Sequence, residues 1–166
     1  MNRPSFITWR PTTTYFLIGG LVLVLISLVI SYAVTTFQPT TSVRMGSSGI
    51  YKLWIADNDL ELQQGLSGVT ELPLDGGLLM KFPGDDTWGI WMKNMNVPLD
   101  IIWVNKDKKI VYIVKNATPD LSTTITFTPK DKARYVIELP AGSVEKSAIK
   151  TGTYVEFDEN DDGGLW

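Results

Sequence analysis

The sequence predicts a mainly β domain, a compact sandwich or barrel with one or two short helices. Three observations carry this prediction. Seven short segments are dense in β-branched and aromatic residues, turn residues such as Gly and Pro separate them, and only one stretch has apolar residues at helical spacing. The chain has 166 residues. An N-terminal apolar run is followed by about one domain's length of chain, by the usual range of roughly 100–200 residues.

The expected strands follow one another between residues 51 and 157. They cover 51–55, 78–82, 88–93, 99–105, 109–115, 134–139 and 153–157. The polar turn at 105–108 joins two of them into a β-hairpin, although it lacks the usual Gly. Residues 117–133 are rich in Thr, Pro and Asp, and we expect them to form a long loop.

One short helix is expected across residues 57–66. Asp57 offers a side chain that can cap the first turn, and Gly65 or Gly68 can end the helix. Residues 143–149 are expected to make a single helical turn.

The apolar run at residues 16–34 predicts a transmembrane helix. It holds 19 residues without a charge, and a span of the bilayer core takes about 20. Arg3 and Arg10 precede it, and the next basic residue is Arg44. The positive-inside rule therefore places the N-terminus in the cytoplasm and the domain outside the cytoplasmic membrane, with the bilayer as a partner of residues 16–34.

Two alternatives stay open for this run. It could be a signal peptide cleaved after Ala33, which would make the domain a secreted protein, or a buried helix of a soluble domain. The organisation expected for an uncleaved anchor has five parts. They are a cytoplasmic N-terminus at 1–15, a signal anchor at 16–34, a flexible Thr- and Ser-rich linker at 35–49, a β domain at 50–158 and an acidic disordered tail at 159–166.

The composition excludes several classes of function. Cys and His are absent, which removes disulfides, thiol catalysis, imidazole chemistry and metal sites built on either residue. The net charge is −3, and both charges before residue 35 are positive. The remainder holds 13 basic and 18 acidic residues, a net charge of −5, so nucleic acid is not an expected partner. No cofactor or metal is expected.

The segment at 88–94 is the first candidate site. Alternation along a strand places Trp91 and Lys93 on one face and Met92 and Asn94 on the other, and Asp100 follows shortly after. Polar groups beside indole rings are typical of a small-ligand pocket, whose aromatic walls suit sugars, flat ligands or cations. In the competing interpretation the tryptophans are core, the lysine amine reaches solvent, and the Asn and Asp side chains bind backbone amides of the turn.

The strand at 134–139 carries the second group of candidates. Its apolar face holds Tyr135, Ile137 and Leu139, and its other face presents Arg134 and Glu138. The charged face could bind a ligand, or it could be a solvated sheet face with surface ion pairs. A glycosidase would need two carboxyl groups facing each other across a cleft. Asp100 and Glu138 are the candidates for such a pair by elimination.

Three sequence blocks together resemble a known family. They are Gln64 to Phe82, with Gln64-Gly65-Leu66-Ser67 and Gly77-Leu78-Leu79-Met80-Lys81-Phe82; Trp91 to Ile102, with Trp91-Met92-Lys93-Asn94 and Pro98-Leu99-Asp100; and Ala133 to Gly142, with Arg134-Tyr135-Val136-Ile137-Glu138-Leu139-Pro140. This combination is similar to the bacterial and archaeal family called domain of unknown function 192, over about residues 50–158.

The resemblance implies a compact, mostly β domain of sandwich-like, jelly-roll-type topology, exported or tethered by one N-terminal segment. It implies no reaction, because the activity of the family is not established. Gln64 stands where the family often has Arg, which removes a charge. The candidates at 93, 94, 100, 134 and 138 all fall inside the motif blocks, which raises the expectation of a site if they share one surface.

We therefore expect an uncharacterised, membrane-anchored module outside the cytoplasm, more a binding or accessory protein than an enzyme. Its ligand would be a small molecule, a glycan or an envelope partner. The candidate contact residues are Trp91, Lys93, Asn94, Asp100, Arg134 and Glu138. Two alternatives stay open: a hydrolase that acts on envelope carbohydrate through Asp100 and Glu138, and a purely structural domain.

Overall fold

The computed structural model describes residues 15, 18–28, 40–47, 49–119 and 125–158 of the chain. Two compact units divide it, Met1–Gln38 and Pro39–Trp166. Residues 18–28 of the first unit are helical. Among the described residues there is no helix with both the length and the apolar character needed to cross a bilayer. The ends of the expected span at 16–34, and the expected acidic tail at 159–166, lie outside the described residues.

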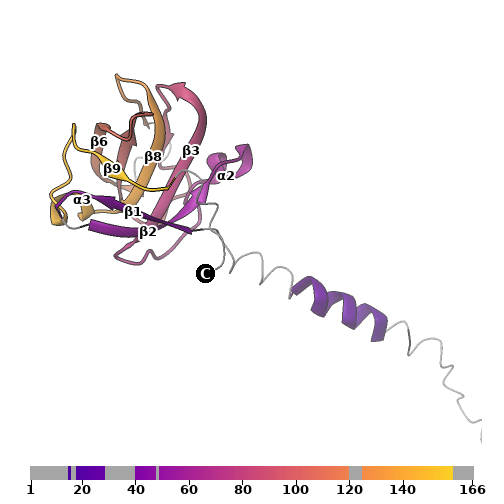
Figure 1. The fold of residues 1–166 in the computed structure, drawn as a ribbon. Coiled ribbons are helices and arrows are strands. Elements are labelled where there is room, and N and C mark those ends of the chain that lie inside the picture. The colour runs from indigo at the N-terminus through magenta and orange to yellow at the C-terminus, as the bar shows by residue number, and fades with distance from the viewer. Residues whose placement is uncertain (1–14, 16–17, 29–39, 48, 120–124, 159–166) are drawn as a thin grey trace, which may run out of the picture. The chain divides into compact units, whose positions relative to one another are not determined.

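The second unit is mainly β. Its elements are β1 (Thr40–Met45), β2 (Gly49–Ala56), α2 (Asp59–Gln64), β3 (Gly76–Asp86), β4 (Ile90–Trp91), β5 (Leu99–Val104), β6 (Ile110–Ala117), β7 (Thr126–Phe127), β8 (Ala133–Pro140), α3 (Ser143–Lys146) and β9 (Val155–Glu156). A seven-stranded sheet has the order β6-β5-β8-β3-β2-β1-β9, and β4 pairs with β7 in a small second sheet. The large sheet curls into a half-barrel, with α2 beside β3 (Figure 1).

The large sheet separates two hydrophobic cores. Ile137 on β8 pairs with Leu79 on β3 and Ile102 on β5, and these three side chains belong to one core. The next residue, Val136, pairs with Met80 and Trp103, and these belong to the other core. All six residues of β5 are buried. Burying an aliphatic or aromatic side chain stabilises the fold by about 1.5–3 kcal/mol, so the three central strands hold the domain together from both faces.

Among the described residues, the strand pairing is antiparallel except at one place. β2 and β3 run parallel, with α2 in the connection between them. Two parallel neighbouring strands need such a crossover. The chain has to return to the end of the sheet at which the first strand began before the second strand can start. This crossover places α2 over the face that carries the second core, where Leu62 packs against it.

The linker expected at 35–49 is wrong for residues 40–45. These residues form β1, which pairs with β2 on one side and with β9 on the other. Burial alternates along the strand, with Val43 and Met45 almost fully enclosed. Thr is a good strand former, and period-2 burial needs only every second residue to be apolar. The Thr- and Ser-rich composition therefore concealed a strand, and the domain begins earlier than residue 50.

Three smaller expectations also need correction. The expected loop at 117–133 contains β7, and the strand expected at 88–93 shortens to Ile90–Trp91. Asn94 lies in the turn after β4 with a φ of 57°, a conformation that Asn tolerates better than most residues. One large curled sheet replaces the two facing sheets of a jelly-roll sandwich.

The expected helix and the expected hairpin are confirmed. An Asn side chain stabilises each of them, at the start of the helix and in the hairpin turn. Asn58, rather than Asp57, caps α2: its Oδ1 accepts a hydrogen bond of 3.2 Å from the Glu61 amide. In the hairpin turn, Asn105 Oδ1 accepts from the amides of Asp107 and Lys109 at 3.1 and 2.9 Å. This Asx turn, together with a positive φ at Lys108, takes the place of the missing Gly.

Candidate functional site

A pocket of about 300 Å³ lies on the face of the sheet that carries the second core. Its walls come from α2 and the loop after it, from β3, and from the segment at 88–91. Its base is formed by buried residues, among them Leu66, Met80 and Ile90. The exposed side chains of Asp59 and Gln63 stand at its mouth, together with Trp91, which is 47% exposed.

Glu138 is the buried acidic residue of this pocket. It lies on β8 between Leu78 of β3 and Ile101 of β5 and is only 4% exposed. Its Oε2 atom has no hydrogen-bond partner among the described residues. Burial disfavours the charged carboxylate and raises the pKa of Glu138 from 4.5 to about 7. The pocket therefore ends on a carboxyl group that is close to half ionised at neutral pH and has an unused acceptor oxygen.

Two stacked rings make the aromatic wall rigid. The centroids of Phe82 and Trp88 are 4.3 Å apart, with an angle of 10° between the ring planes. Trp88 Nε1 donates to the carbonyl of Gly84 at 3.0 Å. The carbonyl of Trp88 accepts from Nε1 of the fully buried Trp103 at 2.8 Å. The wall is thus bonded to a local turn and to the core, so a ligand would meet a preformed surface.

The aromatic wall reaches the pocket because the pairing between β3 and β8 is interrupted after Lys81. Lys81 pairs with Tyr135, and the next pair joins Asp86 to Ala133. Five steps along β3 therefore match two steps along β8, so the residues between, Phe82 to Asp85, bulge out of the sheet. Arg134 holds this bulge in place, since its Nε donates to Asp85 Oδ1 at 2.7 Å in a partly buried ion pair.

Gly65 ends α2 close to the buried carboxyl group. It has a φ of 52°, and its amide donates to the carbonyl of Glu61 at 2.8 Å. A positive φ at the end of a helix favours Gly, because other residues are strained there. A Cβ atom at this position would lie 3.9 Å from Glu138 Oε2. The left-handed turn therefore brings the backbone close to the base of the pocket.

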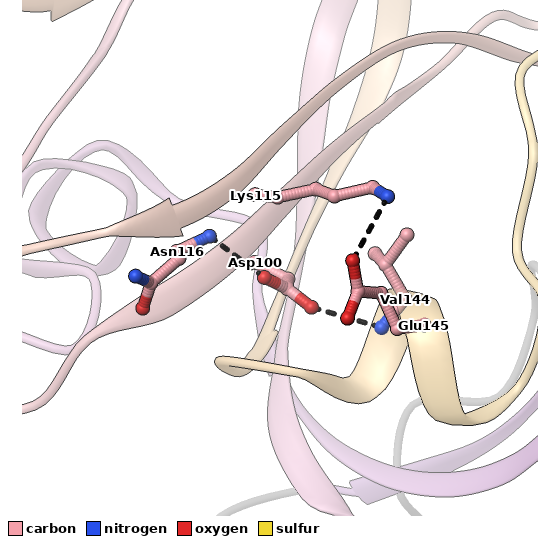
Figure 2. Close-up of polar contacts among 5 residues, drawn as sticks. All are labelled: Asp100, Lys115, Asn116, Val144 and Glu145. Atoms are coloured by element: carbon pink, nitrogen blue, oxygen red, sulfur yellow. Dashed lines mark hydrogen bonds and ion pairs between the residues drawn. The ribbon is translucent and has the colours of Figure 1, made fainter.

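Asp100 lies outside this pocket, and its carboxylate binds backbone groups of the fold. It is 1% exposed, and Figure 2 shows its carboxylate between two backbone amides. Oδ1 accepts from Asn116 of β6 at 2.9 Å, and Oδ2 accepts from Val144 of α3 at 2.8 Å. Lys115 and Glu145 form an exposed ion pair beside it at 3.5 Å. Asp100 thus joins β5, β6 and α3, which agrees with the interpretation that it binds backbone amides.

Lys93 and Asn94 do not line the pocket but support it through their backbone. The carbonyl of Lys93 accepts from Ser67 Oγ at 3.0 Å, and the carbonyl of Asn94 accepts from the Gly68 amide at 2.9 Å. Both side chains are exposed. The turn after β4 therefore fastens the loop that follows α2, and that loop carries Leu66 into the pocket.

The structure thus divides the six sequence candidates. Trp91 and Glu138 line one pocket, Arg134, Lys93 and Asn94 hold its walls, and Asp100 lies elsewhere. The interpretation of the strand at 134–139 as a solvated sheet face is wrong for Glu138, because a second core covers that face.

Sequence reasoning missed Phe82, Leu66 and Asp59 as lining residues. Trp88 lies in the segment at 88–94, whose indole rings were expected to form aromatic walls, and it does line the pocket. Phe82 and Leu66 both belong to the first motif block, which was the signal that the sequence offered for them. In the described part of the chain, no group of three or more Asp, Glu, His or Cys residues is placed to hold a metal ion.

The comparisons with known proteins identify the family. The family model of domain of unknown function 192 (DUF192), described as uncharacterized ACR, matches residues 41–157. The chain belongs to this family. The resemblance of the three sequence blocks is thereby confirmed, and the match includes the whole pocket and β1 from its second residue on. No curated protein matches the DUF192 chain.

Two solved structures share the fold. One, from Sinorhizobium meliloti, is a provisionally assigned transcription regulator; it is 26% identical with a TM-score of 0.68, and the match covers 72% of this chain and 95% of that one. The other is a protein of unknown function from Novosphingobium aromaticivorans; it is 29% identical with a TM-score of 0.65, and the match covers 70% and 83%. The fold of this DUF192 chain therefore recurs in solved structures, and neither of these two proteins is described with an established activity.

Proposed function

We propose that this DUF192 domain is a binding module that takes a small organic molecule into the pocket beneath α2. The observation that carries the proposal is the buried Glu138 carboxyl group, which lacks a partner for Oε2 at the base of an aromatic-walled pocket. The volume of about 300 Å³ falls at the small end of known ligand sites, roughly 300–1,000 Å³. It suits a molecule of the size of one sugar, base or amino acid.

The position of Glu138 supports a ligand more than a purely structural role. Leaving a buried polar atom without a hydrogen bond typically destabilises a protein by roughly 1–3 kcal/mol. An apolar residue of similar size would fit between Leu78 and Ile101 without that loss. Asp100, by contrast, uses both oxygens for backbone amides, as a structural carboxylate does. A ligand that donates to Oε2 would remove the deficit at Glu138.

The hydrolase alternative gains no support from the geometry. A two-carboxylate mechanism needs both groups on the same cleft. Glu138 pairs with Ile101, whereas Asp100 pairs with Leu139, so the two carboxylates point to opposite faces of the sheet.

A role in transcription, as provisionally assigned to the Sinorhizobium neighbour, gains no support from the charge of this chain. Residues 35–166 carry a net charge of −5, and binding to DNA depends on basic groups that neutralise phosphates.

Thermal unfolding of the full chain, purified in a neutral detergent, tests the binding function. The additives are small metabolites, monosaccharides, amino acids and amines. A molecule that binds only the folded state raises the melting temperature by mass action. We expect such a shift to become smaller in Trp91→Ala and in Glu138→Gln.

Two variants control for the loss of a ring or a charge at residues that do not line the pocket. Tyr154→Ala removes an aromatic side chain that is 65% exposed, and Glu145→Gln removes an exposed carboxylate. Both should keep the ligand-induced shift. A shift of unchanged size in Trp91→Ala and Glu138→Gln, or a library without any hit, would contradict the proposed pocket.

The proposed location of the domain is outside the cytoplasmic membrane. The uncharged run at 16–34 and the two preceding basic residues support a tether whose N-terminus is inside. Alkaline extraction of membranes and protease access in intact cells test this directly. Release of the protein by alkali, or a chain shortened by cleavage after Ala33, would contradict an uncleaved anchor.

A further inference from the structure

The charges that line the pocket have one sign. Among its described lining residues, the ionisable ones are Asp59 and Glu138, and both are acidic. Asp59 stands at the exposed mouth, on α2, and Glu138 at the buried base. A cleft lined by charges of one sign concentrates ligands of the opposite sign, and low-dielectric walls strengthen the effect. The pocket therefore favours a cation and disfavours an anion.

The aromatic residues of the pocket favour the same kind of ligand. Phe82, Trp88 and Trp91 all line it. The faces of aromatic rings carry partial negative charge and attract ammonium groups within about 6 Å, with Trp the strongest. Phe82 and Trp88 cover each other by stacking, whereas Trp91 is 47% exposed at the mouth. Trp91 is thus the ring best placed to receive a cation on its face.

Three basic residues of β8, β3 and the turn after β4 do not pair with Glu138. Arg134 shares its face of β8 but lies four residues away, roughly 13 Å along a strand, and pairs with Asp85. Lys81 of β3 pairs in register with Tyr135 and so belongs to the opposite face. Lys93, after β4, is exposed and does not line the pocket. Burial is the cause of the raised pKa of Glu138, and among the described residues its Oε2 atom has no partner.

The acidic groups around Glu138 are also accounted for. On β5, Asp100 faces the other side of the sheet. On α2, Glu61 accepts a hydrogen bond from the Asp57 amide at 3.3 Å, which leaves Asp59 as the second acidic group of the pocket.

From these placements we infer that the ligand is an organic cation, an amine or ammonium compound, held by an ion pair with Glu138 and by the ring of Trp91. This inference rests on the proposed binding function and names its ligand class. The ion pair needs the ionised carboxylate. Where Glu138 is protonated, its proton passes to solvent as the ammonium group binds, and one proton leaves for each cation taken up.

Isothermal titration calorimetry of the full chain in neutral detergent tests the inference with three probes of matched shape: benzylammonium, benzyl alcohol and benzoate. We expect benzylammonium to bind at least about tenfold more tightly than benzyl alcohol, and benzoate not to bind. The Kd for benzylammonium should fall by close to tenfold per pH unit up to about pH 7 and then level off, because deprotonation of Glu138 is linked to binding. Buffers with different ionisation enthalpies should report the released proton.

Glu138→Gln should abolish the pH dependence and most of the preference for the cation, while far-UV circular dichroism confirms that the variant folds. Asp59→Asn should lower the preference by a smaller factor, and the exposed control Glu145→Gln should change neither. Binding of benzyl alcohol or benzoate as tightly as benzylammonium would overturn the cation inference and leave the binding function standing. If none of the three probes binds, the cation inference fails, and the metabolite screen decides the binding function separately.

Discussion

Asp100 and Glu138 lie on neighbouring strands of one sheet, but on its opposite faces. Both carboxyl groups are buried, and their surroundings assign them different roles. Asp100 accepts two backbone hydrogen bonds that join three elements, whereas Glu138 ends a pocket with one oxygen unpartnered among the described residues. The two residues should therefore respond to substitution in opposite ways.

Asp100→Ala should destabilise the domain strongly. It leaves the amides of Asn116 and Val144 without their acceptor, and hydrogen bonds to charged groups contribute about 1.5–3 kcal/mol each. We expect the free energy of unfolding to fall by roughly 2–5 kcal/mol, as measured by urea denaturation. Asp100→Asn keeps one acceptor oxygen and should lose less. A fully stable Asp100→Ala variant would contradict the structural role of this residue.

Glu138→Gln should stabilise the domain above neutral pH. In the wild type, the pKa of Glu138 is about 7 in the folded state against a model value of 4.5. The folded protein therefore holds a proton that the unfolded chain releases, and stability falls as pH rises from 4.5 to 7. The loss approaches about 3 kcal/mol at most, at 1.36 kcal/mol per pKa unit.

The amide of Glu138→Gln cannot ionise, so this part of the decline should vanish. Melting temperatures of the wild type and the variant, measured from about pH 5 to 8, check this expectation. Parallel curves for the two proteins would show that Glu138 does not titrate with a raised pKa.

Arg134→Gln should loosen the bulge that carries Phe82. The ion pair with Asp85 is about one third exposed, so its loss should lower the free energy of unfolding by only about 0.5–1 kcal/mol. Amide hydrogen exchange at residues 82–86 should nevertheless become faster, and ligand binding weaker. Arg44→Gln is the matched control, because its partner Glu156 is 71% exposed and neither residue lines the pocket. Equal exchange at 82–86 in both variants would refute this role of Arg134.

Gly65→Ala should destabilise the end of α2. An Ala residue is strained at a φ of 52°, and such a substitution costs about 1 kcal/mol or more. Gly84→Ala is the matched control, since a Cβ there meets nothing within 4 Å and φ lies outside the left-handed region. Thermal unfolding should separate the two variants. If Gly84→Ala were the less stable one, the argument from backbone conformation would be wrong.

Much of the fold was predictable because its signals are local. Alternation along 134–139 correctly separated Ile137 and Leu139, which belong to the first core, from Glu138, whose partner Ile101 belongs to the second. What covers each face of the strand could not be predicted. The two-residue period of a strand reveals its two faces, but it does not reveal whether a second core covers the polar face. β1 was not predicted for a related reason. Its own composition does not indicate that it pairs with β2 and β9.

The pocket was less predictable than the strands. Trp91 and Glu138 were identified from their residue type and neighbours, but they line one pocket only because the fold brings β4, β8 and the crossover with α2 to the same place. Phe82 enters the wall through a shift of five residues against two between β3 and β8, and no local signal reports such a mismatch. The partners of Asp100 lie 16 and 44 residues away in the chain. Contacts at such separations require the tertiary fold.

The pairing of β1 with β9 has a consequence for the order in which the domain assembles. Arg44 lies beside Glu156, 112 residues later in the sequence. A chain emerging from the ribosome, or from a translocation channel, cannot complete its sheet until almost the last residue of the domain is free. Until then β1 presents an open edge, which is the kind of surface on which unfinished chains associate with one another. Long-range pairing of this kind also slows folding, so the edge of β1 at Arg44 and Met45 stays uncovered until the final strand has formed.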